Sequence, residues 1–152
     1  MWRWLWLSAL VVALDQISKQ WIEEHFVLYE QYPLTGFFNL TLAYNKGAAF
    51  SFLADAGGWQ RWFFAVLALS ICTYLVFWLN KLEKHRVMLP LAIALIIGGA
   101  IGNLVDRLVY GHVIDFLDFY VNNWHWPAFN LADSAITLGV VLFLVDSFKN
   151  EA

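Results

Sequence analysis

Two long stretches without a single charged residue constrain this chain more than any other feature of its sequence. They run from Trp62 to Asn80 and from Val87 to Val105. As a helix, each is long enough to cross a bilayer core of about 30 Å, which takes roughly 20 residues. Hydrophobic residues make up 61% of the chain and charged residues 14%, against about 45–50% and about 25% in average soluble domains. We therefore expect a membrane protein rather than a soluble enzyme, a disordered chain or a basic nucleic-acid-binding domain.

Two further apolar stretches carry a few charges. Leu131–Phe148 holds Asp133 near its start, and Trp2–Ile22 holds Asp15 and Lys19 in its second half. A cleaved signal peptide is the alternative for the first stretch, but no small-x-small cleavage pattern follows it. We expect one domain over residues 1–152, with transmembrane helices at about 2–22, 62–80, 87–105 and 131–148 and outer segments at about 23–61 and 106–130.

Positive charge predicts the orientation of these spans. An even number of spans puts both termini on one side of the membrane, and several basic residues flank that side: Arg3, Lys81, Lys84, Arg86 and Lys149. The positive-inside rule makes it the cytoplasmic side. A net charge of −3 and a single cysteine, Cys72, indicate neither a nucleic-acid partner nor a disulfide framework.

The two outer segments contain patterns that are typical of strands. Phe38–Tyr44 alternates, Asn45-Lys46-Gly47 predicts a turn, and Ala48–Leu53 is a second apolar stretch, so we expect a hairpin over Phe38–Leu53. Gly111–Tyr120, rich in Val, Ile and Phe, predicts another strand. The expected fold class is an α-helical membrane protein with four transmembrane helices and a small extracytoplasmic β element.

Ionisable and polar residues within the spans are costly, which makes them candidates for function. Asp15 and Lys19 are four residues apart and share a helix face, so they form either a structural ion pair or part of a site. Gly99, Asn103 and Arg107 make a stripe at the same spacing in the third span. A gap, an amide and a cation along one face suit a peptide backbone or a lipid head group.

Glycines accompany this stripe. Gly98 and Gly102 form a G-x-x-x-G pair, which lets another helix approach closely. Together with Gly99, they are alternatively expected to leave room for a substrate that arrives laterally from the bilayer.

Carboxylates also stand in the predicted outer strand and at the start of the fourth span. Extended geometry places Asp115 and Asp118 on opposite faces of the strand, so that one can face a site and the other water. Val113 shares the face of Asp115. We expect Asn130 to cap the following helix with Asp133 at the third helical position. Capping alone explains both residues, but it would also fix the backbone that positions Asp133.

Carboxylate chemistry is the reaction type that these residues favour. The sequence contains no G-x-S-x-G, H-E-x-x-H or Walker motif. Two aspartates in one site share a proton, so one can accept a proton from water while the other protonates a carbonyl oxygen. Asp115 and Asp133 are the best pair, with Asp115 favouring the protonated form and Asp133 the ionised form. A small transporter or channel and a purely structural membrane protein remain as alternatives.

Five blocks of this sequence, in order, resemble those of the lipoprotein signal peptidases (signal peptidase II), which are four-span bacterial membrane proteases. The blocks are Asp15-Gln16-x-x-Lys19, Asn45–Ser51, Gly98–Arg107, Gly111–Phe116 and Phe129–Ser134.

The resemblance implies a membrane aspartic endopeptidase that removes the signal peptide from prolipoproteins by cutting just before a diacylglyceryl-modified cysteine. It implies Asp115 and Asp133 as the catalytic dyad. It implies that several further residues line the site and bind substrate: Asp15, Lys19, Asn45, Gly99, Asn103, Arg107, Val113 and Asn130. It also implies an outer β cradle and a short loop helix at about Ala54–Trp62. We expect no metal, no cofactor, contact with membrane lipid, a monomer, and an inner-membrane location with the site near the periplasmic surface.

Overall fold

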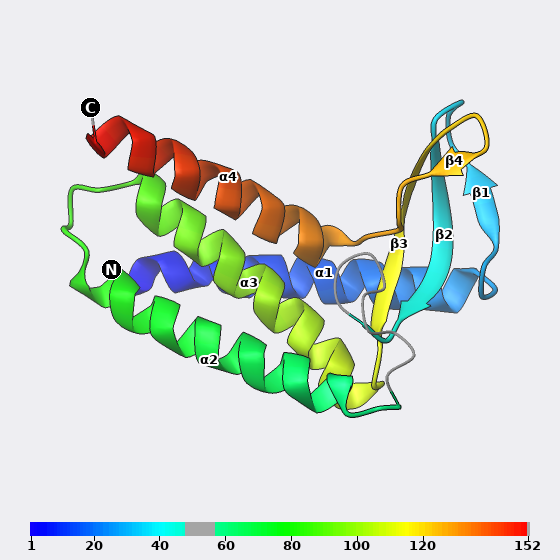
Figure 1. Ribbon diagram of the computed structural model, residues 1–152, viewed down its shortest axis with the longest axis horizontal. Coiled ribbons are helices and arrows are strands. Elements are labelled where there is room, and N and C mark those ends of the chain that lie inside the picture. Colours follow the sequence, from blue (N-terminus) through cyan, green and yellow to red (C-terminus); the bar gives the residue numbers. More distant parts are fainter. Residues whose placement is uncertain (48–56, 152) are drawn as a thin grey trace.

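The computed structural model describes residues 1–47 and 57–151 of the chain. In this part of the chain, long helices lie alongside one another, a small sheet lies at one end of them, and both termini lie at the other end (Figure 1). A 3-10 turn, η1 (Trp2–Trp4), precedes the first helix. The helices are α1 (Leu5–His25), α2 (Gln60–Lys81), α3 (Met88–Val109) and α4 (Leu131–Glu151). The strands are β1 (Gln31–Pro33), β2 (Phe38–Asn45), β3 (Val113–Val121) and β4 (Trp124–His125).

Three of the described helices are long and apolar enough to cross a membrane. They are α2, α3 and the Leu131–Lys149 part of α4, with mean hydropathies of 2.1, 2.1 and 1.8. Helix α1, which carries several charged residues in its second half, is not among them. Helix α3 runs four residues beyond the predicted end at Val105, because the charged groups of Asp106 and Arg107 find partners inside the protein.

Helix α3 lies at the centre of the bundle and packs against each of the other helices. Its glycines are the points of closest approach. A Cβ atom on Gly98 would lie 2.7 Å from Val11 of α1, and one on Gly99 would overlap the carbonyl oxygen of Ala132 of α4. A Cβ on Gly102 would likewise meet α1. The expectation that these glycines leave room for substrate is wrong, because α1 and α4 fill the space above them.

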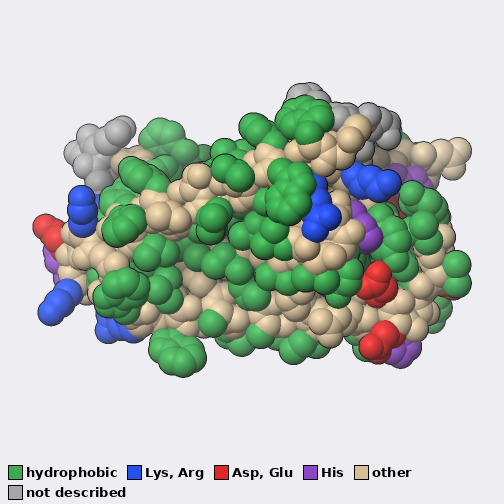
Figure 2. Space-filling model, turned by 90° about the horizontal axis from the view of Figure 1, so that it is seen from below, with side chains coloured by type: hydrophobic (Ala, Val, Ile, Leu, Met, Phe, Trp, Pro, Cys, Tyr) green, Lys and Arg blue, Asp and Glu red, His purple; other side chains and the backbone are tan. Residues whose placement is uncertain are grey.

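Apolar side chains of the bundle point both inward and outward. Cys72 and Leu79 of α2 are buried in one cluster with Ile93 and Ile97 of α3. Other large side chains of the same helix are exposed, among them Phe77 at 66%. On the face drawn in Figure 2, hydrophobic side chains occupy the middle of the molecule, and charged side chains gather toward its two ends. This distribution matches a protein whose middle is surrounded by lipid.

The sheet has the strand order β1-β2-β3-β4, and every neighbouring pair is antiparallel. In the pairing of β2 with β3, Ala43 lies opposite Asp115 and Asn45 opposite Val113. The register shifts between Leu40 and Ala43. Further along β3, Leu117 forms a bridge with the segment that leads into α4. The sheet therefore connects directly to the start of that helix.

The predicted strands Phe38–Tyr44 and Gly111–Tyr120 are confirmed as β2 and β3. The second half of the expected hairpin, Ala48–Leu53, lies outside the described residues, and the described neighbours of β2 are β1 and β3. Of the expected loop helix, Ala54–Trp62, residues 54–56 lie outside the described part, residues 57–59 form a turn, and α2 begins at Gln60. Trp62 belongs to α2.

A second apolar cluster fixes the sheet to α1. Ile22 of α1 is buried together with Leu42 of β2 and with Ile114 and Phe116 of β3. Each of these side chains is at most 5% exposed. Burial of such side chains stabilises the contact by about 1.5–3 kcal/mol each. The position of β3 relative to the helices is therefore determined by packing.

Candidate active site

Asp115 lies in β3, on the strand that is held between β2 and the start of α4. Its side chain is 3% exposed. Asn130 Nδ2 donates a hydrogen bond of 2.7 Å to Oδ1, and Asn45 Nδ2 donates one of 3.2 Å to Oδ2. The carboxylate is thus reached by one amide from the end of β2 and by another from the residue before α4.

Asp133 lies in the first turn of α4, where Asn130 caps the helix. The backbone N–H of Asp133 donates to Asn130 Oδ1 at 2.9 Å, and the backbone N–H of Asn130 donates to Asp133 Oδ2 at 3.3 Å. This reciprocal pair is a capping box, so the predicted cap is confirmed. Because Asn130 also donates to Asp115, one buried asparagine orients both carboxylates.

A second asparagine, Asn103 of α3, strengthens this connection. Its Nδ2 donates to Asp133 Oδ1 at 2.8 Å. Its Oδ1 accepts from Lys19 Nζ at 2.9 Å and from Asn130 Nδ2 at 3.2 Å. Side chains from α1, α3, β3 and the start of α4 therefore form one hydrogen-bonded network around the two aspartates.

A buried ion cluster lies behind this network. Lys19 Nζ is 2.8 Å from Asp15 Oδ2 and 2.8 Å from Asp106 Oδ2, and each side chain is at most 1% exposed. The predicted pairing of Asp15 with Lys19 is confirmed. Asp15 Oδ1 also accepts from the backbone N–H of Ala132, and Asp106 Oδ2 accepts from that of Ile114. The cluster thus fixes the backbone next to both candidate catalytic residues.

Asp106 is the member of this cluster to which the sequence assigned no role. It is the third residue after Asn103 on the same helix, and Gln16 Nε2 donates to its Oδ1 at 2.8 Å. The chain turns between α3 and β3 at Gly111, which has a φ of +81°, a conformation that glycine adopts readily. This turn places Asp106 close to the start of β3, where it accepts from the N–H of Ile114. The sequence feature that could have identified Asp106 is a single carboxylate in an otherwise apolar helix, because such a group needs a partner inside the protein.

Arg107 reaches from α3 to the turn after β2. Its guanidinium donates to the carbonyl oxygen of Gly47 at 2.9 Å and to that of Asn103 at 3.2 Å. It also lies 5.3 Å from the ring centre of Phe64. The backbone N–H of Gly47 donates in turn to Asn45 Oδ1. Arg107 and Asn45 therefore hold the same turn beside Asp115.

Val113 and Gly99 lie next to residues of the polar network: Val113 is opposite Asn45 in the sheet, and Gly99 is against Ala132. Val113 is 2% exposed and shares a strand face with Asp115. Gly99 packs against the backbone of α4 at Ala132, one residue before Asp133. Both positions determine how closely the elements around the site approach one another.

Asp118 does not face water, so that expectation is wrong. Its side chain is 4% exposed, and it accepts a hydrogen bond of 2.9 Å from Asn39 Nδ2. His125 Nδ1 lies 2.9 Å from the carboxylate. Asp118 is on the strand face opposite Asp115, as alternation predicts, but the chain folds back there through β4. Alternation assigns a side chain to a face and does not say what covers that face.

The environment of Asp115 favours its protonated form. Burial raises the pKa of Asp115 to about 7, and the negative charge of Asp133 acts in the same direction. Hydrogen bonds from Asn45 and Asn130 oppose this rise in pKa. A carboxyl group with such a pKa can both donate and accept a proton near neutral pH.

Within residues 1–47 and 57–149, no three His, Cys, Asp or Glu side chains cluster as metal ligands would. The site of this part of the chain consists of two aspartates, two asparagines and a buried ion cluster. Such a set of groups can bind a peptide and transfer protons to and from it.

Comparison with known proteins identifies the family of this chain. Residues 7–149 match the family model of signal peptidase (SPase) II. The chain is 54% identical over 149 residues to the lipoprotein signal peptidase of Pseudoalteromonas atlantica, covering 98% of this chain and 91% of that protein. It is 58% identical over 150 residues to that of Yersinia pseudotuberculosis, covering 99% and 89%.

Solved structures of two bacterial membrane enzymes have the same fold. One has a TM-score of 0.90 at 29% identity and covers 100% of this chain and 91% of its own. The other has a TM-score of 0.85 at 30% identity and covers 98% and 94%. The chain therefore belongs to the signal peptidase II family of peptidases.

Proposed function

We propose that this chain is a membrane aspartic endopeptidase that removes the signal peptide from prolipoproteins, cutting just before a diacylglyceryl-modified cysteine. Membership of the signal peptidase II family supports the removal of signal peptides, and relatives that are 54% and 58% identical are named lipoprotein signal peptidase. The observation that carries the assignment of the dyad is the shared asparagine: Asn130 bonds to Asp115 and caps Asp133.

In the first step, Asp133 acts as the base and Asp115 as the acid. Asn103 Nδ2 and the backbone N–H of Asn130 donate to Asp133, and such donors stabilise a negative charge. Asp133 takes a proton from water as the water oxygen attacks the scissile carbonyl carbon. Asp115, whose pKa is about 7, gives its proton to the carbonyl oxygen. The result is a neutral tetrahedral intermediate.

In the second step, the carbon–nitrogen bond of this intermediate breaks. Asp133 returns its proton to the leaving amine, which becomes the new N-terminus that begins with the modified cysteine. Asp115 takes back a proton from the hydroxyl group as the carboxyl product forms. The two carboxyl groups are then in their starting protonation states, and no covalent enzyme intermediate is needed.

The remaining site residues act in this proposal by positioning or by binding substrate. Asn45 and Arg107 hold the turn next to Asp115 and are the side chains we assign to the substrate backbone. Asn103 and Lys19 orient Asp133 through the hydrogen-bonded network.

The other predicted site residues do not contact the two aspartates directly in this proposal, but they hold the neighbouring backbone in place: Asp15, Gly99 and Val113. We assign them to the site as residues that set its shape, and no metal or cofactor takes part in the proposed reaction.

The membrane arrangement we propose has four spans in one domain over residues 1–152, with α1 crossing the membrane in addition to α2, α3 and α4. The two termini lie at one end of the helices and the sheet at the other (Figure 1). In this arrangement the protein is in the inner membrane and both termini are cytoplasmic. Asp115 and Asp133, at the opposite end of the helices, then lie near the periplasmic surface. A single copy contains the whole proposed site, so the chain acts as a monomer.

Purified Asp115→Asn and Asp133→Asn variants test this function. Each is incubated with a diacylglyceryl-modified prolipoprotein, and the released signal peptide is measured. We expect both variants to fold and to lose cleavage by at least about a hundredfold, the lower end for loss of a general acid or base. Normal cleavage by either variant contradicts the dyad, and loss of activity on adding a chelator contradicts metal independence.

The same variants distinguish the alternatives. A transporter would leave prolipoprotein processing intact in Asp115→Asn. A purely structural role would lower the thermal stability of both variants as much as their activity.

A further inference from the structure

Aromatic side chains gather on one side of the sheet, beyond the carboxylates. They surround a pocket of about 550 Å³. The residues that line it carry no charge: Phe37, Phe119, Tyr120, Val121, Trp124, Trp126 and Phe129. We refer to these residues as the aromatic face. The proposed reaction uses none of them.

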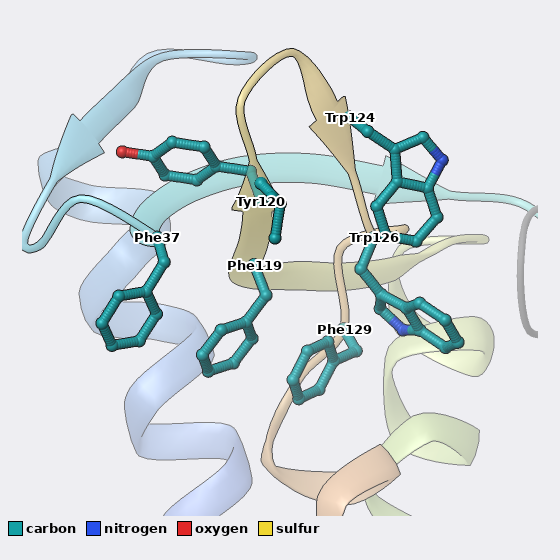
Figure 3. A pocket seen from close by; sticks show the side chains of 7 residues that line it. Phe37, Phe119, Tyr120, Trp124, Trp126 and Phe129 are labelled. Carbon is teal, nitrogen blue, oxygen red and sulfur yellow. The ribbon is translucent and has the colours of Figure 1, made fainter.

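Three rings of this face are directed toward the helices. Figure 3 shows Phe37, Phe119 and Phe129 pointing from the sheet in the same direction, toward the level of α1 and the start of α4. Ring centres of Phe37 and Phe119 are 6.4 Å apart, and those of Phe119 and Phe129 are 5.9 Å apart, both pairs stacked. Phe119 also shares its strand face with Asp115. Phe119 and the two rings that stack with it are therefore on the side of the sheet that contains the candidate site.

This face continues the apolar surface of a membrane-spanning helix. Phe129 is two residues before Leu131, where α4 begins. Leu131 and Leu138 of that helix are 38% and 53% exposed, as side chains in contact with lipid would be. The aromatic face therefore lies within two residues, along the chain, of the exposed apolar side chains of α4.

Several rings of this face are exposed. Phe37 is 58% exposed, Trp124 is 62% exposed and Trp126 is 46% exposed. Contiguous apolar patches of this kind mark contacts with membranes or other molecules. Trp and Tyr are enriched where a membrane meets water, because one end of the ring system is polar. Both types are present here, at the end of the molecule where a membrane surface is expected.

We propose that the aromatic face binds membrane phospholipid, with acyl chains in the pocket and head groups around its rim. This inference depends on the membrane arrangement proposed above. Lipid bound here covers the exposed rings and holds the sheet at a constant depth relative to the helices. Because Asp115 is on the same sheet, this contact also helps to keep it level with Asp133.

The single cysteine of the chain makes a direct test possible. Cys72→Ala provides a cysteine-free background, into which Phe37→Cys and Trp126→Cys are introduced separately. Gln31→Cys is the matched control, because Gln31 is an exposed polar residue on β1 of the same sheet. Each cysteine carries a nitroxide spin label, and the protein is placed in nanodiscs of phosphatidylethanolamine and phosphatidylglycerol. Power-saturation measurements then compare collisions with oxygen, which concentrates in lipid, and with a water-soluble nickel complex.

We expect the ratio of oxygen to nickel collisions to be about tenfold higher at positions 37 and 126 than at position 31, as for groups inserted about 5–10 Å into the interface. Equal ratios at all three positions overturn the proposal. So does a low ratio at positions 37 and 126 that rises only with added prolipoprotein, which would make the face a substrate site. Spin–spin broadening between labels would instead indicate a second copy of the chain and would also overturn it.

Cleavage of prolipoprotein by each labelled protein is measured in parallel. If the labelled proteins cleave prolipoprotein but show equal collision ratios, the result contradicts lipid binding and leaves the proposed peptidase function standing. If they show the expected collision ratios but do not cleave prolipoprotein, the result contradicts the proposed peptidase function and leaves lipid binding standing.

Discussion

The pH dependence of cleavage follows directly from the environment of Asp115. The proposed mechanism needs this side chain protonated, and its pKa is about 7. Between pH 6 and pH 8 the protonated fraction falls from about 0.9 to about 0.1, which follows from a pKa near 7. We therefore expect kcat/KM to decline above pH 7 and to be about tenfold lower at pH 8 than at pH 6.

Removal of one hydrogen bond should move this decline in a defined direction. Asn45 Nδ2 donates to Asp115 Oδ2 at 3.2 Å, and this contact lowers the pKa of Asp115. A hydrogen bond to a charged group contributes about 1.5–3 kcal/mol, and at this length we take the lower value, which equals about 1 pKa unit. Asn45→Ala should therefore raise the pKa of Asp115 to about 8.

The assay measures kcat/KM for a diacylglyceryl-modified prolipoprotein peptide from pH 5 to pH 9. The ratio of kcat/KM at pH 8 to that at pH 6 should rise from about 0.1 in the parent protein to about 0.5 in Asn45→Ala. This ratio cancels any loss of substrate binding that does not depend on pH. Asn39→Ala is the control, since Asn39 is on the same strand but donates to Asp118. A parent profile that stays flat to pH 9, or an Asn45→Ala profile that declines at lower pH, would refute the reasoning.

Four further predictions concern stability and packing. Asp115 has a folded-state pKa of about 7, against an ordinary value of 3.8 for an aspartate, so its ionisation destabilises the folded protein as pH rises through this interval. Asp115→Asn should therefore unfold at a higher temperature than the parent at pH 8 but not at pH 4. Lys19→Met leaves two buried carboxylates without a counter-charge and should lower the free energy of unfolding by about 3–5 kcal/mol in denaturant titrations. Gly99→Ala forces α4 away from α3 and should lower kcat/KM by at least about tenfold, whereas Gly36→Ala, whose Cβ meets nothing within 4 Å, should leave it unchanged. Asp118→Asn should retain most cleavage, and an inactive but folded product would place this buried residue in the mechanism.

Much of the fold could be predicted from local patterns. The uncharged stretches predicted α2 and α3 because a span needs a continuous run of apolar residues. Alternation predicted β2, and enrichment in Val, Ile and Phe predicted β3. The spacing of Asn130 and Asp133 predicted the cap of α4. These patterns depend on neighbours a few residues apart. The spacing of four residues between Asp15 and Lys19 predicted their ion pair for the same reason.

Contacts between distant segments could not be predicted in this way. The N–H group of Ala132 donates to Asp15, 117 residues earlier in the chain. Asp106 joins the pair of Asp15 and Lys19 only because α3 packs against α1. Asp118 lies on the predicted face of its strand, but β4 and the segment after it turn that face into a buried environment.

From the sequence alone, it was possible to predict the apolar helices α2, α3 and α4, the two longer strands β2 and β3, and the family of the chain. These properties depend on composition, short spacings and ordered motifs. The tertiary structure decided what surrounds each polar group: that Asn130 bonds to both Asp115 and Asp133, that helices fill the space above Gly98 and Gly99, and that burial raises the pKa of Asp115. Hydrogen bonding and desolvation depend on distances of a few ångströms between residues far apart in the chain, and only the packed fold sets those distances.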